Sequence, residues 1–151
     1  MEPLLGRPEN AEALRYLAHG RSADEAYCGP PPDGVDRGHL GANPLIVDRV
    51  WDALNAGLPT DARWLVFDSP ALVHPLSHVI LAAVIGTQYA LRLRADDHAE
   101  AVDAGGELIH RFRTVGTELD LPASFGAGWV FGRFDERELR WLRSSYEAHA
   151  I

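Results

Sequence analysis

Four arginines stand at alternating positions of two segments that the sequence predicts to be β-strands. Arg92 and Arg94 belong to one segment, and Arg111 and Arg113, with His110 beside them, belong to the other. Side chains two residues apart in a strand lie on the same face of a sheet. Guanidinium groups bind carboxylates and phosphates through paired hydrogen bonds. If the two strands are neighbours in register, these residues form a binding site for an anion or an acidic segment. The alternative is a solvated face on which the arginines pair with carboxylates of the helices.

Two histidines, His74 and His78, are the candidate metal ligands. A spacing of four residues places two ligands on one face of a helix, but Pro75 disfavours a helix at this point. The glutamate of the metalloprotease arrangement is also missing between them. Asp68 or His110 could supply a third ligand, although nothing in the spacing requires it. Two turn histidines explain the pattern better, and we therefore predict no metal and no other cofactor.

The remaining reactive side chains form no complete catalytic set. Asp97 with His98 or His110 could act as a general acid–base pair, but Asp97 stands at a predicted helix start, where it serves as a cap. Cys28 has no histidine at a spacing that would activate its thiol. Ser69 lacks the flanking glycines of a nucleophile elbow. We predict no catalytic residues, which argues against an enzyme without deciding the point.

The elements expected to position these residues follow the order α, α, β, β, β, α, β, β, α. Helices are expected at 11–19, where Asn10 is the cap, at 44–56, after Asp96 and Asp97, and at 136–148. The expected strands are 63–68 with a continuation at 71–73, then 78–85, 87–94, 107–114 and 129–134. One long strand or a buried helix is the competing interpretation of 78–94. The order predicts an α+β fold with one mostly antiparallel sheet of about four to five strands packed against about three to four helices.

Length and composition indicate one globular domain over residues 1–151, with a Pro/Gly-rich loop at about 29–44. Every basic residue is arginine and alanine occurs 21 times, which suggests a GC-rich bacterial coding sequence. The lone Cys28 excludes an internal disulfide, and no basic segment followed by an apolar run stands near the start. We therefore expect a soluble cytoplasmic protein.

Charge narrows the classes of partner. The chain has 14 arginines against 22 acidic residues, a net charge of −8, which disfavours nucleic acids and anionic membranes. An acidic surface suits solubility or a basic protein partner. We predict a non-catalytic bacterial protein-binding module of accessory, regulatory or toxin-neutralising type. The alternative is a small enzyme or small-molecule binder with an anionic-ligand pocket lined by the Arg and His residues, and a homodimer is a further option.

Overall fold

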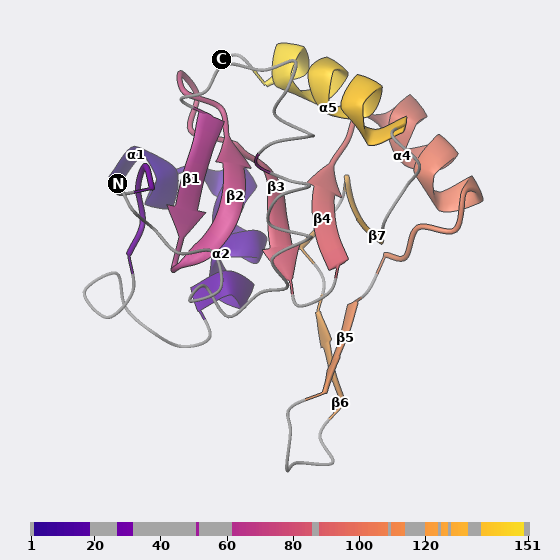
Figure 1. The fold of residues 1–151 in the computed structure, drawn as a ribbon, viewed down its shortest axis with the longest axis horizontal. Helices are drawn as coiled ribbons and strands as arrows, with labels where there is room; N and C mark the ends of the chain where they lie inside the picture. The colour runs from indigo at the N-terminus through magenta and orange to yellow at the C-terminus, as the bar shows by residue number, and fades with distance from the viewer. Residues whose placement is uncertain are drawn as a thin grey trace.

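The structure consists of a five-stranded antiparallel sheet with helices on both faces (Figure 1), which confirms the predicted α+β class. It is a computed structural model of the chain. The residues that it describes are 2–18, 27–31, 51, 62–85, 88–108, 110–113, 120–123, 125–126, 128–132 and 137–149.

Three groups of elements make up this part of the chain. The N-terminal segment contains α1 (Glu2–Leu5), the short 3-10 helix η1 (Pro8–Asn10) and α2 (Ala11–Ala18). The sheet has the spatial order β1 (Arg63–Val66), β2 (Ser69–Val73), β3 (Ile80–Ile85), β4 (Gln88–Arg92) and β7 (Trp129–Gly132). Helix α4 (Ala95–Asp103) follows β4, and α5 (Arg137–Ala148) follows β7. Strands β5 (His110–Arg113) and β6 (Asp120–Ala123) form a separate two-stranded ribbon.

Two hairpins build most of the sheet. The β1–β2 turn consists of Phe67 and Asp68, whose φ angles of 48° and 66° are those of a type I′ turn. Residues 71–73 were expected to continue the first strand, but they run back along it as part of β2. Strands β3 and β4 pair with Ile85 opposite Gln88, which confirms strand rather than helix and two strands rather than one.

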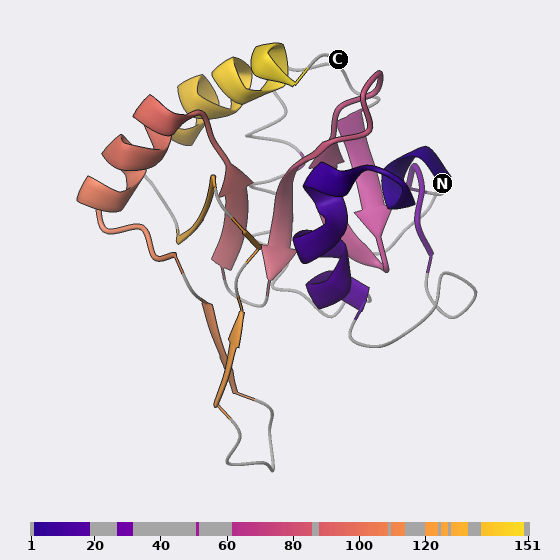
Figure 2. The same cartoon turned by 180° about the vertical axis from the view of Figure 1, so that it is seen from behind.

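One face of the sheet is covered by the N-terminal helices, as the view from behind shows (Figure 2). Leu14 and Leu17 of α2 are buried in a core with the large aromatic side chains of Phe125, Trp129 and Phe131. The rings of Phe125 and Trp129 meet edge-on with their centroids 5.0 Å apart. The apolar side of the N-terminal helix α2 thus covers this face of the sheet.

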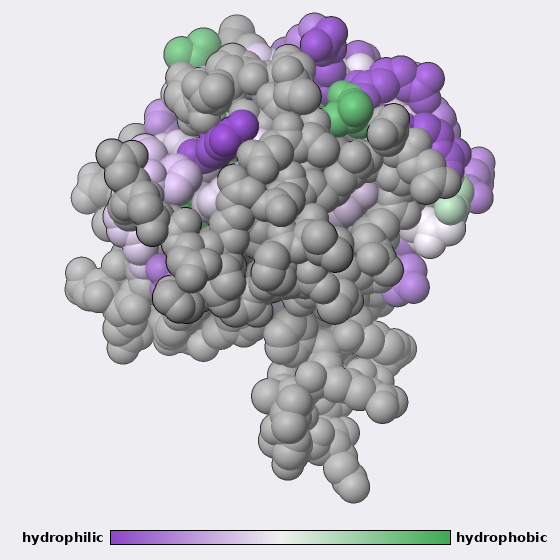
Figure 3. Space-filling view, viewed as in Figure 1, coloured by the Kyte–Doolittle hydropathy of each residue, from purple (hydrophilic) through white to green (hydrophobic). Residues whose placement is uncertain are grey.

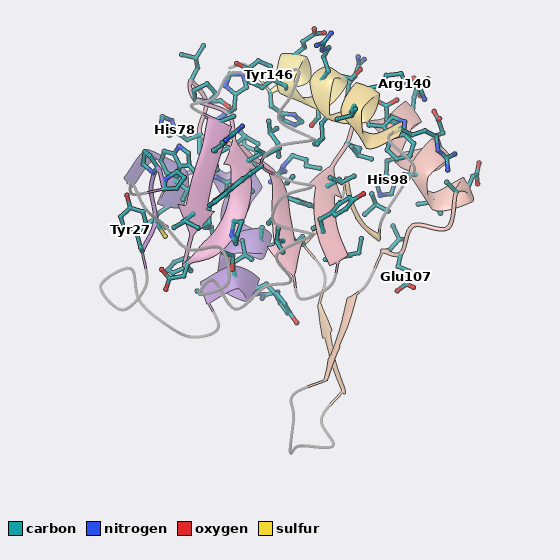
Figure 4. The ribbon with its side chains drawn as sticks, in the orientation of Figure 1. Tyr27, His78, His98, Glu107, Arg140 and Tyr146 are labelled. Atoms are coloured by element: carbon teal, nitrogen blue, oxygen red, sulfur yellow. The ribbon has the colours of Figure 1, made fainter. Side chains whose placement is uncertain are left out.

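The opposite face is covered by α4 and α5. Ala101 of α4 and both Trp141 and Leu142 of α5 are buried in the second core. An exposed ion pair of 2.6 Å joins Arg140 of α5 to Glu100 of α4 (Figure 4). The molecule is therefore a three-layer α/β/α arrangement with a core on each side of the sheet. No helix in the described part of the chain has the length and apolar character needed to cross a membrane.

A β-bulge interrupts the pairing of β2 with β3. Leu72 lies opposite Ala82, whereas Val73 lies opposite Ile80, so that Leu81 is the extra residue. Leu81 and Ala82 consequently both face the core beneath α5, although they are adjacent in sequence. The bulge sets the orientation of Ile80, on which the attachment of the N-terminal helices depends.

Several expectations fall on residues outside the described ranges. They include the helix over 44–56 apart from Trp51, most of the loop at 29–44, and the start of the last helix. Trp51 is buried, and its indole Nε1 donates a hydrogen bond of 3.2 Å to the carbonyl of Ala71 in β2. The ring therefore packs against the sheet.

Candidate interaction surface

Arg92, the first of the predicted site residues, is buried beneath the N-terminal helices. Its side chain donates from Nε to the carbonyl of Ile80 at 2.7 Å and from a terminal nitrogen to the carbonyl of Glu9 at 2.6 Å. The guanidinium carbon lies 4.8 Å from the ring centroid of Trp129. Burial lowers the pKa of Arg92 to about 10, so the group remains charged at neutral pH. These donors hold the fold together and do not open to solvent.

Asn10 binds the same part of β3. Its Oδ1 accepts from the amide of Ile80 at 2.9 Å, and its Nδ2 donates to the carbonyls of Leu4 at 3.0 Å and His78 at 2.8 Å. The expectation that this side chain caps the first helix is therefore wrong, because its hydrogen bonds run to the sheet and to α1. Asn10 and Arg92 together hold both backbone groups of Ile80.

Arg94 lies beyond the end of β4 and is exposed at the start of α4. It precedes the first residue of that helix and makes no side-chain capping hydrogen bond. Asp96 and Asp97, which were expected to cap the helix, lie within its first turn. Negative charge there still favours the helix because it interacts with the positive end of the helix dipole.

The condition on which the arginine site depended, that the two arginine-bearing strands are neighbours, is not met in the described part of the chain. Strand β4 lies between β3 and β7, and within the described part of the chain β5 pairs with β6 alone. Arg92 and Arg94 are therefore separated from the segment that carries His110, Arg111 and Arg113. The sheet does not assemble the four arginines into one patch.

The two candidate metal ligands lie in the loop between β2 and β3. His74 is buried, its Nδ1 accepts from the amide of Leu76 at 3.1 Å, and its ring stacks on Tyr146 with centroids 4.2 Å apart. His78 has a φ of 61° and meets an indole ring of β1 edge-on (Figure 4). The described residues contain no group of three or more His, Cys, Asp or Glu side chains arranged to hold a metal ion.

The β1 edge of the sheet is covered by a short segment of chain. Gly29 exchanges two backbone hydrogen bonds with Leu65, at 2.9 and 2.8 Å. Next to it, the buried Sγ of Cys28 accepts from the amide of Phe67 at 3.2 Å. The thiol therefore helps to hold the segment that covers this edge of the sheet.

The β7 edge is covered in a similar way. Glu107 exchanges backbone hydrogen bonds of 2.9 and 2.7 Å with Phe131. The Nε2 of His98 lies 3.0 Å from the carbonyl oxygen of Trp129, to which it donates. Figure 4 shows His98 and Glu107 on the outer side of β7. The carbonyl of Trp129 and the backbone groups of Phe131 that point away from β4 thus have hydrogen-bond partners.

The β5–β6 ribbon differs from the main sheet because, among the residues that the structure describes, no backbone segment covers its edges. It extends away from the body in both ribbon views (Figures 1 and 2), and the described residues place no third strand beside it. A two-stranded ribbon is marginally stable in water, and its unpaired backbone groups can bind another strand. Its register pairs are His110 with Ala123, Arg111 with Pro122, Phe112 with Leu121, and Arg113 with Asp120.

Sequence reasoning placed β5 within an expected strand but took the residues of β6 for a loop. No protein-family model, curated protein or solved structure matches this chain. The candidate interaction surface is therefore defined by geometry alone, as the β5–β6 ribbon together with Leu108 at its base, which is 54% exposed.

Proposed function

We propose that this chain is a non-catalytic protein-binding module and that the β5–β6 ribbon is its binding arm. One observation carries the proposal. Both edges of the main sheet are covered by backbone and side-chain partners, whereas the ribbon pairs only with itself within the described residues. Native proteins generally cover or blunt their strand edges. An arm whose edges have no strand beside them among the described residues is therefore suited to pairing with another chain.

The surface around the arm supports the same function. Leu108 at the ribbon base is an apolar side chain with an exposed fraction of 54%. The visible surface over α4 and α5 is mainly hydrophilic (Figure 3). An exposed apolar side chain at the base of a projecting arm favours an interface there, because its burial by a partner is favourable.

The partner we propose is another protein of the bacterial cell, with an accessory, regulatory or toxin-neutralising relation to this chain. A net charge of −8 speeds association with a partner whose overall surface is basic. The candidate residues His110, Arg111 and Arg113 all lie on β5, so they belong to the arm.

The test is affinity capture from an extract of the native host with the intact protein as bait, at low and at high salt. A partner retained in stoichiometric amount is expected at low salt. Leu108→Glu should reduce its retention by about tenfold, because a charge then replaces an apolar contact. Leu5→Glu, at a 38% exposed leucine of α1, is the matched control and should retain the partner fully. Failure to recover any stoichiometric partner at low salt would contradict the proposed function.

A further inference from the structure

We propose, resting on the binding function above, that the outer edge of β5 takes up an extended acidic segment of the partner as an added strand. Such a segment would carry Asp or Glu at alternate positions. The two observations that lead to this inference are the place of Pro122 in the ribbon register and the arginines at positions 111 and 113.

Pro122 decides which backbone groups of the ribbon face outward. Proline has no N–H, so it fits a two-stranded ladder where its nitrogen points away from the paired strand. Pro122 lies opposite Arg111. The two residues therefore form a non-hydrogen-bonded pair, in which the backbone N–H and C=O groups of each residue point away from the opposite strand. The alternation of the ladder gives Arg113 and Asp120 the same orientation. The amides and carbonyls of Arg111 and Arg113 thus face the open side of β5.

The same proline distinguishes the two edges of the ribbon. On β6, the outward position at Pro122 lacks a hydrogen-bond donor, which weakens any ladder formed there. On β5, neither outward position is a proline, so each offers one donor and one acceptor. An incoming strand therefore forms a continuous ladder with β5 and only an interrupted one with β6.

The charges at the edge select the chemistry of the incoming strand. Opposite charges directly across a strand pair stabilise it, and like charges destabilise it. Both outward-facing positions of β5, Arg111 and Arg113, are arginines. An added strand with carboxylates at the positions opposite Arg111 and Arg113 would therefore place opposite charges across the strand pair.

A second copy of this chain is a poor occupant for the same reason. If the β5 strands of two copies paired in an antiparallel way through Arg111 and Arg113, each arginine would lie opposite an arginine of the other copy. The net charge of −8 does not alter the local preference, because exposed charges are screened beyond about 8 Å at physiological ionic strength. The occupant is thus an acidic segment of a different protein.

The test measures binding of two labelled octapeptides to the intact protein by fluorescence anisotropy. One peptide alternates glutamate with valine, and the other alternates lysine with valine. We expect the acidic peptide to bind at least about tenfold more tightly, with an affinity that falls as salt is added. Equal binding of the two peptides would overturn the proposal.

Three variants separate strand addition from simple charge attraction. Arg111→Ala removes the charge and keeps the backbone amide, and it should weaken binding of the acidic peptide about threefold. Arg111→Pro removes both, so it should weaken binding by about a further fivefold. Arg94→Ala, at an exposed arginine outside the ribbon, is the matched control and should bind as the unaltered protein does. Equal binding by Arg111→Pro and Arg111→Ala would rule out strand addition.

Two further results distinguish this inference from the proposed function. If a host partner is captured equally by the unaltered protein and by Arg111→Pro, the proposal of strand addition at β5 is overturned. The proposed binding function is then unaffected. A homodimer in sedimentation that Arg111→Pro converts to monomer would assign the edge to a second copy, and it would overturn the acidic occupant.

Discussion

At the scale of single residues, Ile80 is where the N-terminal helices are joined to the sheet. Its amide donates to the Oδ1 of Asn10, and its carbonyl accepts from the Nε of Arg92. Buried polar groups are costly unless they are hydrogen-bonded, whereas apolar contacts tolerate small shifts. These two side chains therefore fix where the helices sit on the sheet, a position that apolar packing alone would leave less specific.

The first prediction follows from that arrangement. Arg92→Met should lower the free energy of unfolding by about 2–4 kcal/mol, because it leaves the buried carbonyl of Ile80 and the partly buried carbonyl of Glu9 without their donors. Arg94→Met is the matched control, since Arg94 is exposed, and it should change stability by less than about 0.5 kcal/mol. Urea denaturation measures both values. Similar losses in the two variants would show that the buried hydrogen bonds are not the cause.

The pH dependence of Arg92 has a definite sign. Burial lowers its pKa from the ordinary value of arginine to about 10 in the folded protein, so the folded state releases this proton at a lower pH than the unfolded chain does. The stability that this group contributes is thus constant near neutral pH and rises with pH above about 10, because there the unfolded chain binds more protons than the folded protein. The difference between the unaltered protein and Arg92→Met should accordingly stay constant from about pH 6 to 9.

At the scale of elements, the β1–β2 turn performs two tasks. Its second residue, Asp68, has a φ of 66° and closes the hairpin. The same residue accepts from the amide of Tyr27 through Oδ1 at 3.1 Å, and its own amide donates to the carbonyl of Tyr27 at 2.9 Å. The turn therefore also anchors the segment that covers the β1 edge.

The second prediction concerns this turn. Asp68→Asn should leave stability nearly unchanged, because asparagine tolerates a positive φ and keeps an acceptor for the Tyr27 amide. Asp68→Val should lower the free energy of unfolding by about 1–3 kcal/mol, because a β-branched residue is strained at this φ and offers no acceptor. Urea denaturation compares the two. A valine variant as stable as the asparagine variant would contradict the role assigned to the turn.

Local patterns in the sequence predicted much of the fold. Apolar spacing predicted α2 and α5, and β-branched or alternating runs predicted β1, β3, β4 and β7. The reversal before 71–73 was missed because Phe67–Asp68 lacks the Asn-Gly or Asp-Gly signature of a type I′ turn. Strand β6 was missed because it is short and contains Pro122, which weighs against a strand. Such signals act over a few residues and are overridden by tertiary pairing.

The candidate site was less predictable than the fold. Periodicity fixes which residues of one strand share a face, but it does not determine which strands are neighbours. The cluster depended on adjacency of the two arginine-bearing strands, and β7 instead lies beside β4. The burial of Arg92 was also unexpected, because arginine is mostly exposed and nothing local reveals the two distant carbonyls that it binds.

At the scale of the whole molecule, the sheet and the ribbon should differ in local stability. Strands β3 and β4 are central in the sheet, with a core on each face. The ribbon has one partner strand for each of its strands and no further strand among the described residues. Regions with few buried contacts open at a lower free energy than the core, so the binding arm belongs to the less stable part of the protein.

The third prediction measures this difference by native-state hydrogen exchange. Amides of Ala82, Ala83, Ala90 and Leu91 should exchange most slowly, because they open only when the sheet itself unfolds. The amides of Arg111 and Arg113 should exchange faster by a factor on the order of 10³ or more, because they face the open edge of β5. A saturating acidic peptide should slow exchange at these two residues while leaving the central strands unchanged, since only the edge gains hydrogen bonds. Equal protection of ribbon and sheet in the free protein would mean that the ribbon is already covered, and the case for an open binding edge would then fail.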